Sequence, residues 1–276
     1  MSDWLRWQVG SRIVPGPVAV PWVGGARLLV VPGMTGATGN VYVGLHEFEE
    51  MAFLTHLLRR GDLFVDAGAN IGSFTVLAAA VSGATCLAFE PHPPTFAQLE
   101  DNVRINHLEP LVTARQSALG ERPSELRLTA SLDSANHLLS PDEPNGSGFV
   151  SVPVNRLDTE LGDRVPTAIK IDVEGFETSV LDGAGPTLAQ EHLLAVVMEL
   201  NGSGRRYGFR DEDLHQRMLA HGFASCRYAP FSRRLDQLPD GECPFGNGVY
   251  VRRSQLELVR QRLADAPALD VKGLSV

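Results

Sequence analysis

The sequence predicts an α/β fold in which a mostly parallel sheet is covered by helices on both faces. Two observations lead to this prediction. Strand-like and helix-like segments alternate along the middle of the chain, and the strand-like runs are almost continuously apolar. Continuous apolar strands are typical of parallel sheets that are buried on both sides. A chain of 276 residues with 43% hydrophobic residues suits one such domain with an extension.

We divide the chain into an N-terminal extension, residues 1–45, and an α/β domain, residues 46–276. The extension is rich in glycine, proline and β-branched residues, and short strands are expected at Ala26–Val31 and Val41–Val43. It also holds all three tryptophans, Trp4, Trp7 and Trp22. We interpret it as a cap packed on the core, and keep a substrate lid or a dimer contact as the alternative.

The elements of the domain follow from periodicity and from their end signals. Helices are expected from Glu47 to before Gly61, and at Ser73–Val81, Pro94–Asn106, Glu177–Gly183, Asp211–His221 and Gln255–Ala264. Strands are expected at Leu63–Ala67, Thr85–Glu90, Val112–Ala118, Leu126–Leu132, Phe149–Val154, Ala168–Asp172, Leu193–Leu200, Ala224–Tyr228 and Gly248–Arg252. A polar loop is expected at Ser140–Gly148. Ligands of such sheets bind beyond the carboxyl ends of the strands.

Charge and cysteine content narrow the class of partner. The formal net charge is −9, and no run of lysine or arginine resembles a phosphate-binding stripe, which disfavours a nucleic-acid substrate. The three cysteines are far apart and show neither CxxC nor zinc spacing. There is no signal-peptide pattern and no membrane-spanning run, so we expect a cytoplasmic protein that acts on a small molecule.

A glycine-containing turn follows the first strand of the domain. Gly68 and Gly72 allow a tight bend and a close approach of the backbone to a ligand. The N–H groups of the helix that follows can face an anionic group. Asp66 precedes the glycines and suits an amine, such as that of S-adenosylmethionine, directly or through water. The glycine spacing differs from the G-x-G-x-x-G of dinucleotide folds, which argues against a nicotinamide-dependent oxidoreductase.

An acidic residue ends the next strand. Glu90 follows the glycine turn by one helix and one strand, and its carboxylate can accept two hydrogen bonds from ribose hydroxyls. Phe89 and Pro91, on either side of it, can pack on an adenine ring. The alternative is a solvated carboxylate at the end of a strand.

These motifs and several others resemble the FkbM-type methyltransferase family. The matching segments are Asp66–Gly72, Phe89–Pro91, Asn102, Asn106, Ser117–Gly120, Val152–Val154, Leu157–Asp158, Ile169–Glu177 and Val180–Ala184. The resemblance covers roughly residues 41 to 200. One departure is Ala67, where many members carry valine or isoleucine.

The resemblance implies a Rossmann-like class I methyltransferase sheet of seven strands with an antiparallel last strand. It also implies S-adenosylmethionine as donor, and usually a hydroxyl acceptor on a natural product or sugar. Matching positions imply cofactor-binding roles for Asp66, Gly68, Asn70, Gly72, Glu90, Ser117 and Ala118.

Methyl transfer to a hydroxyl requires a group that removes the proton. Asp172 and Glu174 follow a predicted strand, and either is a candidate base or a ligand for the acceptor hydroxyl. The structural alternative is that Asp172 caps a helix beginning at Gly175, with Lys170 and Glu177 as supporting charges. His46, which precedes the first helix of the domain, is an alternative base.

Oxygen-bearing side chains also suggest a metal hypothesis. Asp172, Glu199 and Asn201 end neighbouring strands and could together bind Mg²⁺, in outline like catechol O-methyltransferase. Mg²⁺ would then be a cofactor beside S-adenosylmethionine.

We therefore expect an S-adenosylmethionine-dependent O-methyltransferase that acts on a small molecule, with no nucleic acid and no membrane as partner. The alternatives are methylation of an amine or a carboxyl group on the same scaffold, and a non-catalytic nucleotide-binding module. A homodimer is left open.

Overall fold

The computed structural model describes residues 16–31, 35–129, 137–139 and 148–276. Its centre is an eight-stranded sheet with the order β12-β11-β13-β10-β9-β3-β4-β5. The strands of this sheet are β3 (Leu63–Ala67), β4 (Thr85–Phe89), β5 (Val112–Arg115), β9 (Ala168–Ile171), β10 (Ala195–Leu200), β11 (Phe223–Ala229), β12 (Arg234–Gln237) and β13 (Gly246–Arg252).

The direction of the strands confirms the predicted fold class. Strands β5, β4, β3, β9 and β10 are parallel neighbours, and β13 is antiparallel to both β10 and β11. The predicted count of seven was wrong by one strand, because β12 adds to the edge as a hairpin with β11. Within β12 only Leu235 is buried, so the sequence carries no apolar pattern that would have indicated it.

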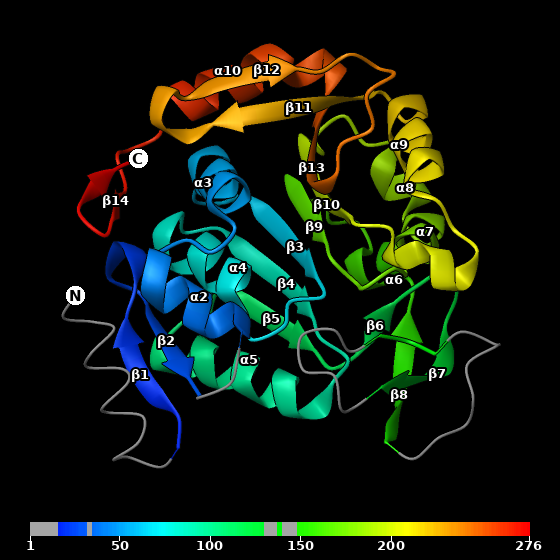
Figure 1. Cartoon of the computed structure of the whole chain (residues 1–276), viewed down its shortest axis with the longest axis horizontal. Helices are drawn as coiled ribbons and strands as arrows, with labels where there is room; N and C mark the ends of the chain where they lie inside the picture. Colours follow the sequence, from blue (N-terminus) through cyan, green and yellow to red (C-terminus); the bar gives the residue numbers. More distant parts are fainter. Residues whose placement is uncertain (1–15, 32–34, 130–136, 140–147) are drawn as a thin grey trace.

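Helices cover both faces of the sheet (Figure 1). Those on one face are α3 (Phe48–Leu57), α4 (Ser73–Val76, which continues as a π-helix over Leu77–Val81), α5 (Pro93–Ile105) and α10 (Leu256–Ala264). Those on the other are α6 (Leu157–Leu161), α7 (Glu177–Asp182), α8 (Gly185–Leu188) and α9 (Asp211–Ala220). Each face of the sheet packs with its helices into a separate hydrophobic core, the first with α3, α4, α5 and α10 and the second with α6, α7, α8 and α9. Successive residues of a strand point into opposite cores: Phe64 packs in the first and Val65 in the second.

Smaller elements flank the main sheet. Strands β6 (Ala118–Leu119), β8 (Phe149–Asn155) and β7 (Ser124–Thr129) form a separate three-stranded sheet. The predicted strand Val112–Ala118 was therefore wrong as one element: it divides into β5 and β6, which belong to different sheets. A two-stranded hairpin, β14 (Asp270–Val271) with β15 (Leu274–Ser275), follows α10.

The N-terminal region contains one predicted strand and one corrected element. Strand β2 (Arg27–Val30) pairs with β1 (Val18–Pro21). The predicted strand Val41–Val43 was wrong, because these residues end helix α2 (Thr35–Val43). Their β-branched side chains favour a strand locally, but the helix buries Val41 against Leu28 and Val30, and tertiary packing outweighs local propensity.

Some predictions fall outside the described residues. Trp4, Trp7 and residues 140–147 of the predicted polar loop are among them, whereas Trp22 packs beside the first core and its Nε1 donates to the Gly44 carbonyl oxygen.

Among the residues whose placement is described, no helix combines the length and apolarity that a membrane span requires.

The turn after β3 is packed directly on the end of β9. Gly68 has φ +80°, and a Cβ atom there would lie 1.7 Å from the carbonyl oxygen of Asp172. Glycine is therefore required at this position both by backbone conformation and by space.

Replacing Gly68 with alanine should lower the free energy of unfolding by roughly 3 kcal/mol or more, because β3 and β9 must separate to admit the methyl group. Gly61→Ala is the matched control. Gly61 also has positive φ, but a Cβ atom there would meet no atom of the described residues within 4 Å beyond its chain neighbours, so a loss of about 1 kcal/mol is expected. Chemical denaturation measures both values, and equal losses would contradict the steric argument.

Candidate functional site

A cavity of about 410 Å³ lies beyond the carboxyl ends of β3, β4, β9 and β10. Its volume is in the usual range of small-molecule sites. The lining residues that matter below are Asn40, His46, Glu47, Gly68, Ala69, Asn70, Phe89, Glu90, Pro91, Ser117, Ala118, Leu119, His137, Leu138, Lys170, Asp172, Glu174, Phe176, Glu199 and Asn247. The cavity therefore combines residues from every strand end that the sequence singled out and from the N-terminal region.

The glycine turn is held against the end of β4. Backbone N–H groups of Gly68 and Ala69 both donate to the carbonyl oxygen of Phe89, at 3.0 and 2.9 Å. Asn70 has φ +52°, a left-handed conformation, and its N–H donates to Glu90 Oε2 at 2.9 Å. These bonds fix the turn and the carboxylate of Glu90 as one unit.

Glu90 is buried at the wall of the cavity. Its Oε1 accepts a second hydrogen bond, from the N–H of His92 at 2.8 Å. Burial raises the pKa of Glu90 to about 7, although these two N–H donors favour the charged form. Each carboxylate oxygen has a further lone pair, so Glu90 can still accept hydrogen bonds from a ligand in the cavity.

Asp66 lies behind the cavity wall and not on it. The side chain is fully buried, and its Oδ2 accepts a hydrogen bond from Thr75 Oγ1 at 2.6 Å. Among the described residues, Oδ1 has no hydrogen-bond partner, and burial raises the pKa of this carboxyl group. The predicted contact between Asp66 and a cofactor amine thus requires water or a rearrangement, and it stays a prediction.

Lys170 is a buried cation between several carboxylates. Its Nζ lies 2.7 Å from Asp172 Oδ2 and 4.5 Å from the ring centre of Phe74. Burial disfavours the ammonium form, but the charges of Asp172, Glu47 and Asp66 outweigh burial and raise the pKa of Lys170. Lys170 therefore stays positively charged and orients Asp172.

The structural alternative for Asp172, a cap on a helix beginning at Gly175, is not realised, because α7 begins at Glu177 and its N-cap residue, Phe176, makes no side-chain capping hydrogen bond. Glu177 Oε1 accepts hydrogen bonds from the backbone N–H groups of Val173 and Gly175, at 3.2 and 3.1 Å. Asp172 is thus left to pair with Lys170 and to face the cavity.

The turn after Asp172 places Glu174 in a restricted backbone conformation. Glu174 has φ +55°, and Gly175, which follows it, has φ +102°. A Cβ atom on Gly175 would lie 2.7 Å from the backbone of Ser203, so this turn packs closely on the loop after β10. Left-handed conformations of non-glycine residues persist where the surroundings hold them, and they concentrate at functional sites.

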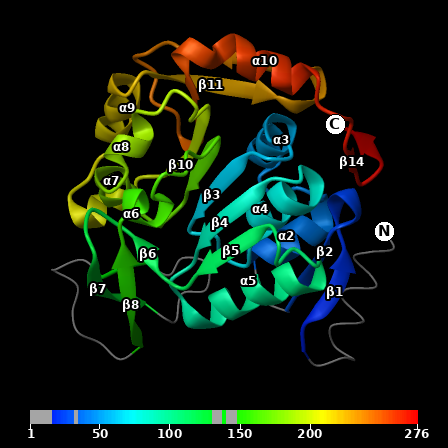
Figure 2. The same cartoon turned by 180° about the vertical axis from the view of Figure 1, so that it is seen from behind.

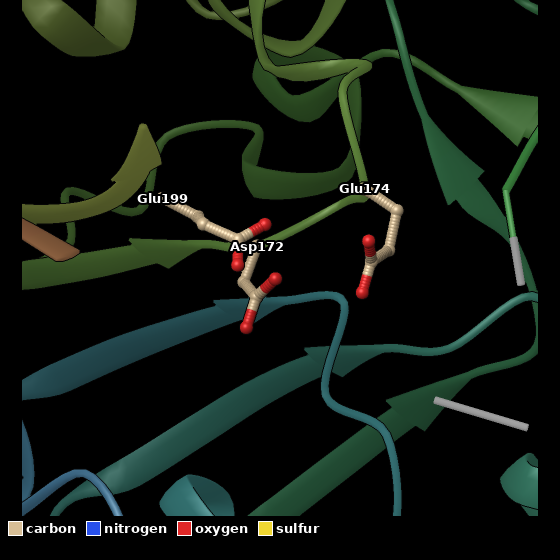
Figure 3. Close-up of side chains that lie close together, drawn as sticks. All are labelled: Asp172, Glu174 and Glu199. Atoms are coloured by element: carbon tan, nitrogen blue, oxygen red, sulfur yellow. The ribbon is translucent and has the colours of Figure 1, made fainter. Parts of the chain in front are cut away.

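Three carboxyl groups meet at the centre of the site (Figure 3). Ligand oxygens of Asp172, Glu174 and Glu199 lie within 4.8 Å of one another. Burial, and after it the negative charge of Asp172, raises the pKa of Glu174 to about 7. Burial, and after it the charges of Asp172 and Glu174, raises the pKa of Glu199 to about 9. At neutral pH Glu199 is therefore protonated and Glu174 is close to half-protonated.

The predicted metal trio is not assembled as expected. Asn201 is exposed, is not among the described residues that line the cavity, and accepts a hydrogen bond from the N–H of Ser203 at 2.9 Å. Strand β10 ends at Leu200, so Asn201 belongs to the turn and its side chain bonds locally. Glu174, and not Asn201, lies beside Asp172 and Glu199, and these three carboxyl groups offer three oxygen ligands.

His46 and Glu47 approach the site from the start of α3. His46 is exposed at the cavity, and its backbone N–H donates to Asn40 Oδ1 at 2.9 Å. Glu47 Oε2 accepts a hydrogen bond from Asn247 Nδ2 at 2.8 Å. Asn247 lies opposite Glu199 in the register of β13 with β10, which brings both side chains to the same edge.

Sequence reasoning missed Asn247 and His137. Asn247 stands between two glycines, a pattern that indicates a turn, so the predicted strand began after it. His137 lines the cavity beside Leu138, in the segment after β7, and its position carries no recognisable pattern. The predicted pair Ser117 and Ala118 does line the cavity, and Ser117 Oγ accepts a hydrogen bond from Asn155 Nδ2 at 3.4 Å.

Comparison with known proteins identifies a family for this chain and relatives that are similar over part of their length. The family model described as the methyltransferase FkbM domain matches residues 66–225. Methyltransferase 1 of Beauveria bassiana is 34% identical over an alignment of 143 residues that covers 43% of this chain and 57% of that protein. Hexuronic acid methyltransferase AglP of Haloferax volcanii is 28% identical over 149 residues, 51% of this chain and 56% of that protein. The chain thus spans little more than half the length of these relatives.

A solved structure is also similar. The methyltransferase FkbM of Methylobacillus flagellatus is 19% identical, with a TM-score of 0.45 over 69% of this chain and 43% of that one.

The carboxyl cluster predicts a pH-dependent cost to stability. Folded Glu199 holds a proton up to a pH of about 9, whereas an ordinary glutamate releases it near 4.5, so this group destabilises the fold as the pH rises between these values. Glu199→Gln should raise the free energy of unfolding by about 1 kcal/mol at pH 8, after allowance for solvent screening.

Urea titration at pH 5 and pH 8 measures this gain, which should be much smaller at pH 5. Glu109→Gln, at an exposed turn, is the control and should change the stability little at either pH. A Glu199→Gln gain that is equal at both pH values would contradict the assigned protonation of Glu199.

Proposed function

Because the chain belongs to the methyltransferase FkbM domain family, we propose that it transfers the methyl group of S-adenosylmethionine to a hydroxyl group of a small molecule. The observation that carries this proposal is the shared cavity. It joins the glycine turn and Glu90 at one side to Asp172, Glu174 and Glu199 at the other. A donor site and an acceptor site are thus continuous.

The residues present fit S-adenosylmethionine. The fixed carboxylate of Glu90 has lone pairs for the two ribose hydroxyls, and the apolar surfaces of Phe89 and Leu119 line the cavity beside it, where an adenine ring needs them. The turn at Gly68 brings backbone, without a side chain, to the cavity surface. Ser117 and Ala118 complete this side of the cavity.

The three carboxyl groups suit the acceptor side. Bound S-adenosylmethionine supplies a methyl group that is already activated on a sulfonium, so the protein has to align the acceptor and remove its proton. Glu174, with a pKa of about 7, can take a proton near neutral pH. Asp172, oriented by Lys170, can accept a hydrogen bond from the acceptor, and protonated Glu199 can donate one.

His46 remains the alternative base, since it also lines the cavity. The proposal uses no metal, because the Lys170 ammonium 2.7 Å from Asp172 repels a divalent cation at the same carboxylate. Turnover that survives thorough treatment with EDTA would support this choice.

The acceptor is proposed to be a natural product or a sugar. The relative named as a hexuronic acid methyltransferase supports a sugar-like acceptor. The second candidate is an amine, because the carboxyl groups of Glu47, Asp172 and Glu174 outnumber the Lys170 ammonium along this part of the cavity. Mass and NMR analysis of the methylated product, after incubation with matched hydroxyl and amine compounds, distinguishes the two.

The donor assignment is tested by calorimetry. S-adenosylmethionine and S-adenosylhomocysteine should bind to the wild type and NAD should not. At pH 8, above the pKa of about 7 of Glu90, Glu90→Ala should weaken binding by roughly tenfold or more, since hydrogen bonds to a charged group contribute about 1.5–3 kcal/mol. Glu100→Ala is the control and should bind like the wild type, because Glu100 is a partly exposed glutamate on α5 that pairs with Arg104. Tight binding of NAD, with no response to S-adenosylmethionine, would overturn the proposal.

The proposed base gives a pH profile. As the pH rises from 6 to 8, Glu174 loses its proton, so kcat/KM should rise with a midpoint near pH 7. Glu174→Gln should lower kcat by roughly a hundredfold or more, flatten this rise and leave the affinity for S-adenosylhomocysteine unchanged. If Glu174→Gln keeps the rise and His46→Gln abolishes it, the base is His46.

A further inference from the structure

Ile71, in the glycine turn, is packed into a hydrophobic cluster supplied by the N-terminal region. Its partners in that cluster are Leu28 and Val30 of β2 and Val41 of α2, with Val18, Val20 and Trp22 packed around them. All of these partners precede residue 66, where the match to the family model begins. We call residues 18–31 and 35–46 the N-terminal segment.

Asn102, on α5, connects the same two parts by hydrogen bonds. Its side chain is fully buried; Oδ1 accepts from the N–H of Leu29 at 2.7 Å, and Nδ2 donates to the carbonyl oxygen of Ile71 at 2.8 Å. Strand β2 lies beside α5 in both views (Figure 2). Asn106, one helical turn later, bonds the N–H and the carbonyl oxygen of Arg27, so it holds β2 without touching the glycine turn.

A third connection runs through Asn40, a buried residue of α2. Its Nδ2 donates to Ser73 Oγ at 3.2 Å, and its Oδ1 accepts from the N–H of His46 at 2.9 Å. Ser73 is the first residue of the helix that the glycine turn opens. The N-terminal segment therefore contacts the turn at Ile71 and again at its downstream end.

The backbone of the turn is left-handed at three positions. Gly68, Asn70 and Gly72 all have positive φ, and for Asn70 this is an uncommon conformation. A non-glycine residue keeps a left-handed conformation where neighbouring structure determines it. Ile71, directly after Asn70, is held by its side chain and by its carbonyl group.

We propose that the N-terminal segment, acting through Ile71, Asn102 and Asn40, holds the glycine turn in the conformation that binds the donor. These are positioning residues: donor affinity depends on packing outside the part of the chain that the family model matches. The inference rests on the proposed function for the identity of the ligand. Because coupling is reciprocal, a bound donor or product must in turn stabilise the N-terminal segment.

The first test compares two leucine variants of the full chain, with S-adenosylhomocysteine as the probe and calorimetry well below the melting temperature. Leu28→Ala removes a fully buried side chain from the cluster around Ile71. Leu263→Ala removes an equally buried side chain from α10, in a different core. We expect about tenfold weaker binding for Leu28→Ala, in the range of coupled sites, and less than about twofold change for Leu263→Ala.

A second pair separates the connection to the turn from the connection to β2. Asn102→Ala removes the two hydrogen bonds by which this side chain joins Leu29 to Ile71, whereas Asn106→Ala removes only contacts outside the turn. Affinity should fall roughly tenfold in the first and stay within about twofold in the second.

Hydrogen exchange on the wild type provides a measurement that needs no variant to fold. Saturating S-adenosylhomocysteine should slow exchange of the Leu29 N–H and its neighbours in β2 at least about fivefold. Wild-type binding with no protection of β2, and with Leu28→Ala and Asn102→Ala both binding normally, would overturn this inference alone. A wild type that binds neither S-adenosylmethionine nor S-adenosylhomocysteine would overturn the proposed function, and the inference with it.

Discussion

The buried ammonium of Lys170 is the interaction on which the site depends. In the register of β3 with β9, Lys170 lies opposite Asp66, and strand alternation brings Asp172 to the same face two residues later. Lys170 therefore stands between a carboxylate inside the protein and one at the cavity. Removing one partner of a buried ion pair typically costs 3–5 kcal/mol, so the carboxyl end of this sheet requires the Lys170 cation.

Around that cation the carboxyl groups differ in protonation because the charges that surround each of them differ. Glu199 has its pKa raised to about 9 and Glu174 to about 7, while Asp172 is paired with Lys170. One cluster thus offers a hydrogen-bond donor, a group poised to take a proton and a fixed acceptor. The repulsion between carboxylates that raises these pKa values to different extents also destabilises the fold, as is common where function places charges close together.

The side of the cavity at the glycine turn is built differently, from backbone groups rather than from clustered charges. Gly68 allows the turn to touch β9, and Glu90 fixes the turn through the N–H of Asn70. The outer side of the turn is covered by the N-terminal segment through Ile71. The N-terminal region, which the sequence suggested to be an added cap, is thus packed directly against the glycine turn.

The sequence alone determined the parallel sheet, the glycine turn and the strand-end carboxylates Glu90, Asp172 and Glu174, because these depend on local periodicity and on residues adjacent in the chain. Only the tertiary structure decided that Glu199 meets Glu174 instead of Asn201, and that Val41–Val43 is helical. Those outcomes depend on where strand β10 ends and on contacts between distant segments. Such contacts leave no periodic signal, since a side chain's partners across the fold are set by register and packing and not by its neighbours in sequence.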